Sequence, residues 1–472
     1  MDAFADSNSN GFPISRRWIA VWLVIAAAVA AAMAVVKDRP GDSKVYALGA
    51  ERMLAGERVY RPEEDSAFTY PPFCGLYFVP LSPLSEPVRR GCFYFANFVL
   101  LGTIVFLVIR QVGPVISAGE RAGGPPMWAY FTIVAALSAR FLVSPIENQA
   151  HDLILLALMT AAIVAWGAAK NKTAGLWAGL ATATKATPLL FLPIFLWQRR
   201  FSAAGALVVV TAAATLLPDF VLPQKNGERW AMSWYGSFVS KVGVGQAADA
   251  EGAWRSWNML NQSLAGTVHR LSTPISPAEA ENDLFDVSVW SAGPRGVKTL
   301  TLLAQLAVLG WLALVTWEPK AARTPAGPTA VNHLSSTESM LAFRRLGQGS
   351  AILCAMLLLS PMSSKQHFCA LFLPIAWCTA HVLYRRRDRF VMAALAFVFV
   401  STTLLVKDVV GRPLGNLALG YGSLTFATIA CFAATGYVLV QDRAVVADRL
   451  TDRRQSGSSD ETCAAEARPA AA

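Results

Sequence analysis

Long apolar runs recur along the whole chain and are separated by shorter polar segments. A helix needs about twenty predominantly apolar residues to cross a bilayer. The pattern therefore predicts an all-α polytopic membrane protein rather than several soluble domains. The runs lie at 18–36, 91–110, 127–144, 151–168, 202–217, 297–317, 349–361, 367–384, 390–406 and 416–440.

One further apolar segment, 173–197, has basic residues on both flanks. Two lysines precede it and Arg199-Arg200 follows it. Because the positive-inside rule places both flanks on the cytoplasmic side, the segment must enter the membrane and return. We expect the turn between Lys185 and Pro188, where proline interrupts a helix. Counted as two passes, this segment gives about 12 transmembrane helices in all, with both termini cytoplasmic.

The polar segments between the runs differ in length and composition. The stretch 73–84 is too short to span, so we expect it to lie on the outer surface. The tail has the composition of a disordered segment, and 318–347 has that of a linker. The chain is therefore expected to form a single transmembrane domain at 1–450 with outer loops at 37–90 and 218–296 and a cytoplasmic linker at 318–347, followed by a disordered cytoplasmic tail at 451–472.

Composition agrees with a membrane protein. Hydrophobic residues make up 54% of the 472 residues and charged residues 15%, well below the value of about 25% for soluble proteins. These figures exclude a soluble enzyme, a coiled coil and a disordered protein. The net charge is +10, but the basic residues gather in short segments between runs, including Arg344-Arg345 and Arg385–Arg387. The positive-inside rule accounts for this placement without a nucleic-acid partner.

Short motifs for cofactors and metals are missing from the sequence. The seven cysteines include no CxxC pair. No P-loop, GxGxxG, HExxH or GxSxG sequence stands in a supporting context. We therefore expect neither a metal nor another cofactor, and a nucleotide-driven pump is disfavoured.

Polar residues that could carry chemistry stand at the outer ends of the predicted helices. Asp42 opens a short amphipathic segment after the first run, either as a helix cap or as a general base. Lys185 lies in an otherwise apolar segment, where it either binds a phosphate or reaches back to the interface. The polar stretch Glu147–Asp152 and the turn containing Lys365 and His367 add to the set. Together these residues suggest one site at the outer membrane face.

In order and spacing these motifs resemble glycosyltransferase family 87, the polyprenol-phosphate-mannose-dependent mannosyltransferases of the GT-C type. The resemblance covers roughly residues 37–375. The turn at its end departs from the family pattern, because Ser364 replaces the usual Trp and Gln366 the usual first His. The matching segments are Asp42–Tyr46, Leu54–Tyr60, Phe68–Pro72, Asn148–Leu153, Ala174–Pro188, Asn261–Ser263 and Ser360–His367.

The resemblance implies a fold, a reaction and a set of site residues. The fold is GT-C-like, with amphipathic helices on the outer surface in the first extracytoplasmic loop. The donor is a polyprenyl-phosphate sugar, with mannose the expected sugar, and the acceptor is a hydroxyl of a glycolipid or glycan. Asp42 is the expected general base of an inverting transfer on the extracytoplasmic face of the inner (plasma) membrane. The expected phosphate- and substrate-binding residues are Lys185, Lys365, His367, Asn148, Gln149, Tyr70, Asn261 and Ser263.

Two alternatives remain open from the sequence. A polytopic transporter or flippase for a polyprenyl-linked or other amphiphilic substrate also suits a broken helix with a lysine at the break. Such a protein is expected to show paired repeats, and the break at 173–197 has no counterpart in the second half of the sequence. A catalytically silent relative with a binding role is the other alternative.

Overall fold

The computed structural model describes residues 16–37, 41–64, 67–243, 256–275, 286–318 and 334–443, and every regular element within these ranges is helical. The expected tail at 451–472 and residues 319–333 of the expected linker lie outside the described residues. In chain order the elements are α1 (Arg16–Val36), α2 (Ser43–Ala55), α3 (Pro72–Leu76), η2 (Val79–Leu81), α4 (Glu86–Arg121), α5 (Met127–Glu147), α6 (Asp152–Gly167), α7 (Asn171–Thr184), η3 (Thr187–Leu190), α8 (Phe191–Trp197), α9 (Phe201–Val221), α10 (Trp230–Ser237), η4 (Val239–Lys241), α11 (Leu264–Ser272), α12 (Gly293–Thr316), α13 (Leu334–Leu359), η6 (Lys365–Leu371), α14 (Phe372–Tyr384), α15 (Arg389–Phe399), η7 (Val400–Leu404), α16 (Lys407–Val410), α17 (Arg412–Gly420) and a last helix, Ser423–Arg443.

Eight helical segments in the described part are long and apolar enough to cross a bilayer. Many of their apolar side chains face outward. Trp18 and Val24 on α1, for example, are 69% and 70% exposed. Apolar surface of this extent needs lipid around it, so the prediction of a polytopic membrane protein is confirmed. The eight segments are Arg17–Val36, Glu86–Arg121, Met127–Glu147, Phe201–Val221, Gly293–Thr316, Glu338–Leu359, Lys365–Tyr384 and Ser423–Arg443.

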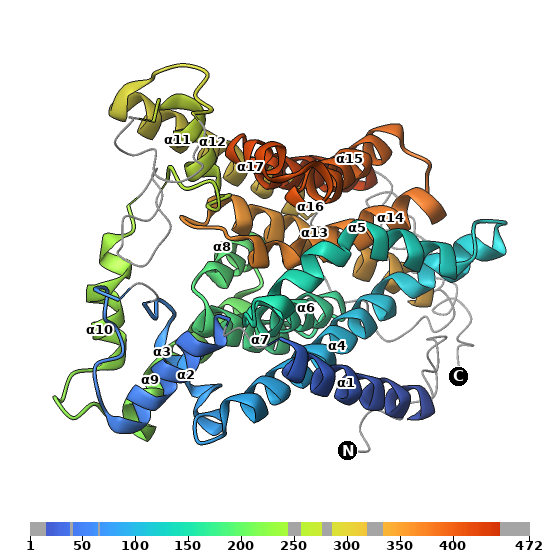
Figure 1. The fold of residues 1–472 in the computed structure, drawn as a ribbon. Coiled ribbons are helices and arrows are strands. Elements are labelled where there is room, and N and C mark those ends of the chain that lie inside the picture. Colours follow the sequence, from blue (N-terminus) through green and yellow to red (C-terminus); the bar gives the residue numbers. More distant parts are fainter. Residues whose placement is uncertain are drawn as a thin grey trace, which may run out of the picture.

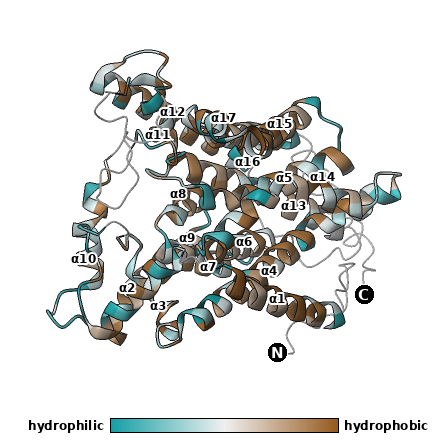
Figure 2. Ribbon diagram, viewed as in Figure 1, coloured by the Kyte–Doolittle hydropathy of each residue, from teal (hydrophilic) through white to brown (hydrophobic). Residues whose placement is uncertain are grey.

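The long helices lie roughly side by side, with α1 and α4 at one edge and α15 and α17 at the other (Figure 1). The apolar windows of Glu338–Leu359 and Lys365–Tyr384 are 89% and 83% buried, so α13 and α14 form the centre of the bundle. Hydrophobic colouring follows the long helices, whereas hydrophilic segments gather near α10 and in the loops at the ends of the bundle (Figure 2). Helices α2, α3 and α10 lie together at one end, here called the α2 end.

A second, smaller cluster of buried side chains forms at the α2 end. Tyr46 of α2, Phe68 and Phe78 pack in it with Trp230 from the second long polar segment. The indole nitrogen of Trp230 donates to Leu222 O, 2.7 Å away, and the side chain is fully buried. This tryptophan is therefore part of the packing that joins the two polar segments.

Helices α7 and α9 approach each other closely because α7 carries Gly175 and Gly179, the spacing of a GxxxG motif. A Cβ atom on Gly179 would lie 2.8 Å from Val210 Cβ and 2.9 Å from Leu207 O. Gly175 stands against the backbone of Ala203 in the same way. The contact fixes the position of the C-terminal end of α7, where Lys185 follows.

The positions of Arg344 and Arg345 differ from the sequence interpretation, which placed this pair in a cytoplasmic loop. Both residues belong to α13, and their side chains are buried. Arg345 Nη1 donates to Trp166 O at 2.7 Å, and Arg344 Nη1 donates to Leu439 O at 2.8 Å. The two guanidinium groups thus satisfy carbonyls near the C-terminal ends of two helices. Helical structure consequently begins at Leu334, inside the segment that was expected to be a linker.

The run 416–440 was expected to form one helix, but in the structure it contains the end of one helix and the start of the next. Helix α17 ends at Gly420, and the last helix begins at Ser423. Gly422 between them has φ +86°, a left-handed conformation that favours glycine. The stretch 73–84 holds only the short elements α3 and η2, in agreement with the prediction that it is too short to span.

We expect Gly179→Ala to destabilise the protein, since the added methyl group overpacks the α7–α9 contact. Overpacking of a filled core costs about 1–3 kcal/mol. The matched control is Gly205→Ala on α9, where a Cβ meets no atom within 4 Å. Thermal unfolding of the detergent-solubilised protein should show a lower midpoint for Gly179→Ala alone, and equal midpoints would contradict the proposed close contact.

Candidate active site

Lys185 occupies a break in the helical backbone between α7 and η3. Its backbone is extended, with φ −153° and ψ 130°. The break has a local cause, because the ring of Pro188 would clash with the carbonyl of Thr184, four residues earlier, if the helix continued. The predicted interruption of 173–197 is therefore present, and Lys185 stands at it.

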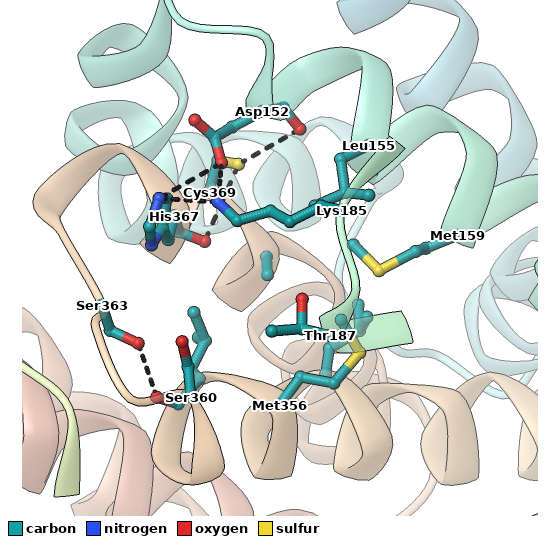
Figure 3. Close-up of a pocket in the computed structure, with 13 residues that line it drawn as sticks. Asp152, Leu155, Met159, Lys185, Thr187, Met356, Ser360, Ser363, His367 and Cys369 are labelled. Atoms are coloured by element: carbon teal, nitrogen blue, oxygen red, sulfur yellow. Dashed lines mark hydrogen bonds and ion pairs between the residues drawn. The ribbon is translucent and has the colours of Figure 1, made fainter. Parts of the chain in front are cut away.

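The Lys185 ammonium group meets two partners from distant parts of the chain (Figure 3). It lies 3.3 Å from Asp152 Oδ1, at the start of α6, and 2.7 Å from His367 Nε2 in η6. It also lies 5.9 Å from the ring centroid of Tyr70. The side chains of Lys185 and Asp152 are only 15% and 4% exposed, so this ion pair is largely shielded from solvent.

The hydrogen bonds of His367 assign its tautomer. Its Nδ1 accepts the backbone N–H of Ser364 at 3.1 Å, so the proton of the neutral imidazole sits on Nε2. The lysine ammonium also carries only donors. The two groups lie 2.7 Å apart, and Asp152 Oδ1, 3.3 Å from the ammonium nitrogen and 3.8 Å from Nε2, is the anionic oxygen that both of them face.

A narrow cavity adjoins Lys185, His367 and Asp152 (Figure 3). Its polar end is formed by these three side chains, and Met159 of α6 and Met356 of α13 lie on its apolar side. The free volume is about 30 Å³, far below the about 300–1,000 Å³ of typical ligand pockets. A larger ligand therefore requires the flexible side chains around the cavity to move.

Asp42 stands at the N-cap position of α2, as the sequence predicts, but its side chain makes no capping hydrogen bond. The carboxylate instead accepts a hydrogen bond from Gln366 Nε2 at 3.0 Å. Its backbone N–H donates to Asn148 O at 2.9 Å, and Gly41 stands so close to that carbonyl that a Cβ atom would clash. These backbone contacts fix the position of Asp42. Its carboxylate does not cap α2 and so remains available for chemistry.

Burial raises the pKa of Asp42 from 3.8 to about 6, and the negative charge of Asp152 adds to the rise. The hydrogen bond from Gln366 and the charge of Lys185 act in the opposite direction. A carboxylate with a pKa near the operating pH is suited to accept a proton in a reaction.

An aromatic layer lies beside the ion pair. Tyr46 OH and His151 Nδ1 are 2.9 Å apart, and the rings of Tyr70 and His151 meet edge to face with centroids 4.4 Å apart. Burial raises the pKa of both tyrosines well above the ordinary value, so their hydroxyl groups keep their protons. Tyr70, one of the predicted binding residues, lies close to Lys185, because its ring centroid is 5.9 Å from the ammonium nitrogen.

Gln149 and Asn148 hold the turn between α5 and α6. Gln149 adopts the left-handed φ of 53°, and its buried side chain bonds to Ser43 Oγ and to Tyr94 OH. The exposed Asn148 side chain donates to Ser144 O at 2.8 Å. The backbone carbonyl of Asn148 accepts the hydrogen bond from the backbone N–H of Asp42. Both residues support the position of Asp42 through the backbone and through Ser43.

Asn261 and Ser263 are buried behind the turn that leads into η6. Asn261 Oδ1 accepts the N–H of Ser363 at 3.3 Å, and its Nδ2 donates to Pro361 O at 3.3 Å. Ser263 Oγ caps α11 by accepting from Gly266 N at 3.0 Å. In the structure these two residues fix the turn, and the contacts described for them do not reach Asp42 or Lys185.

The comparisons with known proteins identify the family of the chain. Residues 68–343, more than half of the chain, match the model of glycosyltransferase family 87. The chain belongs to glycosyltransferase family 87. It is therefore an enzyme that transfers a sugar, and its apolar helices embed this transferase in a membrane.

Two relatives are polyprenol-phosphate-mannose-dependent α-(1-2)-phosphatidylinositol mannoside mannosyltransferases. The one from Mycolicibacterium smegmatis is 26% identical over 74% of this chain and 71% of its own length. The one from Mycobacterium tuberculosis is 28% identical over 63% of this chain and 69% of its own length. No solved structure matches the transferase.

The matched segment leaves out both ends of the candidate site. Asp42 precedes it and His367 follows it, whereas Lys185 and Asp152 lie inside it. The structure brings the three parts of the transferase together through the contacts of Gln366 with Asp42 and of Lys185 with His367.

Three residues of the site were not among the predicted binding residues: Asp152, Gln366 and His151. Asp152 was visible as an acidic residue opening a leucine-rich helix, but that position is also an ordinary helix start. Gln366 could be singled out only as a departure from the family pattern. Lys365, which was predicted, is not among the residues that line the cavity beside Lys185 and His367.

We expect Asn261→Ala to destabilise the transferase by about 1–3 kcal/mol, because it leaves the buried N–H of Ser363 without its acceptor. Asn226→Ala, at an exposed asparagine that accepts from Glu228 N, is the matched control. Thermal unfolding in detergent should distinguish the two variants. A midpoint for Asn261→Ala equal to that of the control would show that Asn261 does not fix the turn.

Proposed function

We propose that this transferase moves a mannosyl group from a polyprenyl-phosphate donor to an acceptor hydroxyl of a glycolipid or glycan, with inversion and with Asp42 as the general base. The single observation that supports this most directly is the pairing of Lys185 with the Nε2 side of His367 at the polar end of a mostly apolar cavity. Both groups are donors, and an anionic phosphate on an apolar chain fits them. The donor named for both relatives agrees with this chemistry.

The proposed reaction is a direct displacement. The acceptor hydroxyl gives its proton to the Asp42 carboxylate while its oxygen bonds to the anomeric carbon of mannose. The bond from that carbon to the phosphate oxygen breaks, and its electron pair leaves with the polyprenyl phosphate, which gains one negative charge. Lys185 and the Nε2–H of His367 stabilise that developing charge. One displacement without an enzyme nucleophile inverts the anomeric carbon.

The apolar side of the cavity suits the lipid part of the donor. Met159 and Met356 have flexible, polarisable side chains that can reshape around an isoprenyl unit. The first isoprenyl group would then lie between α6 and α13 while the phosphate is held at Lys185. This arrangement keeps the sugar on the Gln366 side, toward Asp42.

A GT-C-type topology with twelve crossings fits the helices. Four segments join the eight long ones: α6, α7, the η3–α8 segment and the α15–η7 segment. Short elements at membrane depth are tolerated where they line a protein cavity, as η3 does. We place both termini in the cytoplasm and the α2 end on the extracytoplasmic face of the inner membrane, in accordance with the basic residues at the opposite end.

Transfer in liposomes tests this function and the role of Asp42. Purified protein is reconstituted with radiolabelled polyprenyl-phosphate mannose and a membrane lipid extract as acceptor. We expect wild-type protein to label the acceptor, and we expect Asp42→Asn and Asp42→Ala to abolish labelling while donor binding persists. Glu51→Gln removes an exposed carboxylate from the same helix and should keep full activity.

The assay also separates the alternatives. Transfer that survives both Asp42 variants would move the base elsewhere, with Asp152 the next carboxylate. Movement of the donor lipid between leaflets without transfer from any polyprenyl-phosphate sugar would overturn the transferase proposal and favour a flippase. Neither transfer nor movement would indicate a catalytically silent relative.

The raised pKa of Asp42 predicts a pH dependence. Asp42 must be deprotonated to accept a proton, and its pKa is about 6. The rate should therefore be constant above about pH 7 and fall about tenfold per unit below pH 6. Initial rates between pH 4.5 and 8, at donor and acceptor concentrations well below KM, measure this profile, because kcat/KM reports the pKa of the free enzyme. A flat profile throughout the range would contradict the assignment of Asp42 as the base.

Lys185 should act in both stability and catalysis, and paired variants separate the two roles. Lys185→Met leaves the buried Asp152 without its cation, so it should lower both thermal stability and kcat. Lys185→Met combined with Asp152→Asn removes both charges and should recover stability, while kcat remains about 10²–10³-fold below wild type. Recovery of activity together with stability would show that Lys185 is only structural.

A further inference from the structure

The amide of Gln366 reaches the carboxylate of Asp42 from a distant part of the chain. Gln366 Nε2 donates to Asp42 Oδ2 at 3.0 Å, across 324 positions of sequence. An ionised carboxylate only accepts hydrogen bonds, so the amide must turn its NH₂ group toward it. Within the described residues no other side chain hydrogen-bonds to this carboxylate, and Oδ1 is therefore left to accept a proton.

The start of η6 is fixed by hydrogen bonds on both sides of Gln366. His367 Nδ1 accepts the backbone N–H of Ser364 at 3.1 Å, and the backbone N–H of His367 donates to Ser364 O at 3.0 Å. One residue earlier, Ser363 O accepts the backbone N–H of Gln262 at 2.8 Å. The backbone that carries Gln366 is thus held on both sides, and the direction of its side chain toward Asp42 follows.

The charged groups near Asp42 act on it through space. Asp152 raises the pKa of Asp42 and Lys185 lowers it, but these two form an ion pair of their own at 3.3 Å. The hydrogen bond from Gln366 also lowers the pKa of Asp42. It is the contact that both directs the carboxylate and stabilises its ionised form. The titratable side chains that face Asp42 are Asp152 of α6, Lys185 after α7, Tyr46 of α2 and Tyr70 before α3.

A glutamine at this position differs in one chemical respect from the histidine of the family pattern, because an amide does not ionise. It attracts the carboxylate as a neutral donor at every pH. An imidazole becomes a cation below its usual pKa of about 6.5, and a cation beside a carboxylate lowers the carboxyl pKa by about 1–3 units. The two side chains therefore hold a neighbouring base with different strength in acid, which gives a way to detect the contact.

We propose that Gln366 is the positioning residue of the general base: it holds Oδ2 of Asp42 with a donor that does not ionise, so that Oδ1 faces the acceptor hydroxyl. This inference rests on the proposed function, since it assigns the proton of the acceptor hydroxyl to Asp42. When Oδ1 takes that proton, Oδ2 becomes the carbonyl oxygen of the acid and still accepts from the amide. The orientation of Asp42 is therefore kept through the transfer.

Three variants of the full-length protein test this role. Gln366→Met removes the donor and keeps a side chain of similar length, whereas Gln366→His places an N–H donor at a similar reach. Gln224→Met is the matched control, because the Gln224 amide donates to Ser233 Oγ at 3.1 Å. Transfer in liposomes gives kcat, KM for the donor and the pH profile of kcat/KM.

A second measurement follows Asp42 without transfer. Dicyclohexylcarbodiimide is an apolar reagent that reacts with protonated carboxyl groups. The rate at which it labels the peptide containing Asp42 is measured by mass spectrometry between pH 4.5 and 8. The midpoint of this rate against pH gives the pKa of the carboxyl group in each variant.

We expect Gln366→Met to lower kcat about 10- to 100-fold and to keep KM within about threefold, because a misdirected base affects the transition state more than binding. Both pH midpoints should move up by about one unit, since the ionised form has lost a hydrogen bond. Gln366→His should recover at least about a tenth of wild-type kcat at pH 7 and move both midpoints down by about one unit. Gln224→Met should match wild type in every readout.

Several results would overturn the role of Gln366. Equal kcat and equal midpoints in wild type and Gln366→Met would do so, and so would a loss of kcat without any shift of the midpoints. If Gln366→Met does not fold, a labelling midpoint of Gln366→His equal to that of wild type would overturn it. Shifted labelling midpoints in a protein that shows no transfer at all would instead overturn the proposed function and leave the contact between Gln366 and Asp42 in place.

Discussion

An ammonium group inside an apolar helix bundle needs a nearby anion, and Lys185 meets this requirement through Asp152. The rest of the site is organised around this pair. Helix α7 ends where Lys185 can leave the helix, α6 begins with the carboxylate, and η6 brings His367 to the same point. Asp152 neutralises the charge of Lys185, while the ammonium group and the Nε2–H of His367 still line the polar end of the cavity, where they can also donate to an incoming anion.

Much of the membrane architecture was predictable because it depends on local composition. Apolar runs predicted the long helices, and a proline predicted the break at Lys185, since both effects act within a few residues of the chain. The errors have the same origin. Counting apolar residues in a window does not detect a glycine turn such as the one at Gly422. A pair of basic residues likewise suggests a loop, although the guanidinium groups of Arg344 and Arg345 donate to buried backbone carbonyls inside the bundle.

The candidate site was predictable by residue type and less so by arrangement. Asp42, Lys185 and His367 stood out as ionisable groups near predicted helix ends, and the structure brings them to neighbouring positions. The position of Asn261 behind the turn depends on contacts between segments about 100 residues apart, which no local pattern encodes. The importance of Gln366 likewise depends on docking η6 against the start of α2. Family resemblance supplied the order of the motifs but not these contacts.

The first turn of the 3₁₀-helix η6, residues 365–367, also constrains how the protein can diverge. Adding or removing one residue there would rotate the following side chains by about a third of a turn and exchange their partners all at once. Evolutionary change in this turn is consequently confined to substitution at fixed length, so each position can be altered while the other two keep their direction.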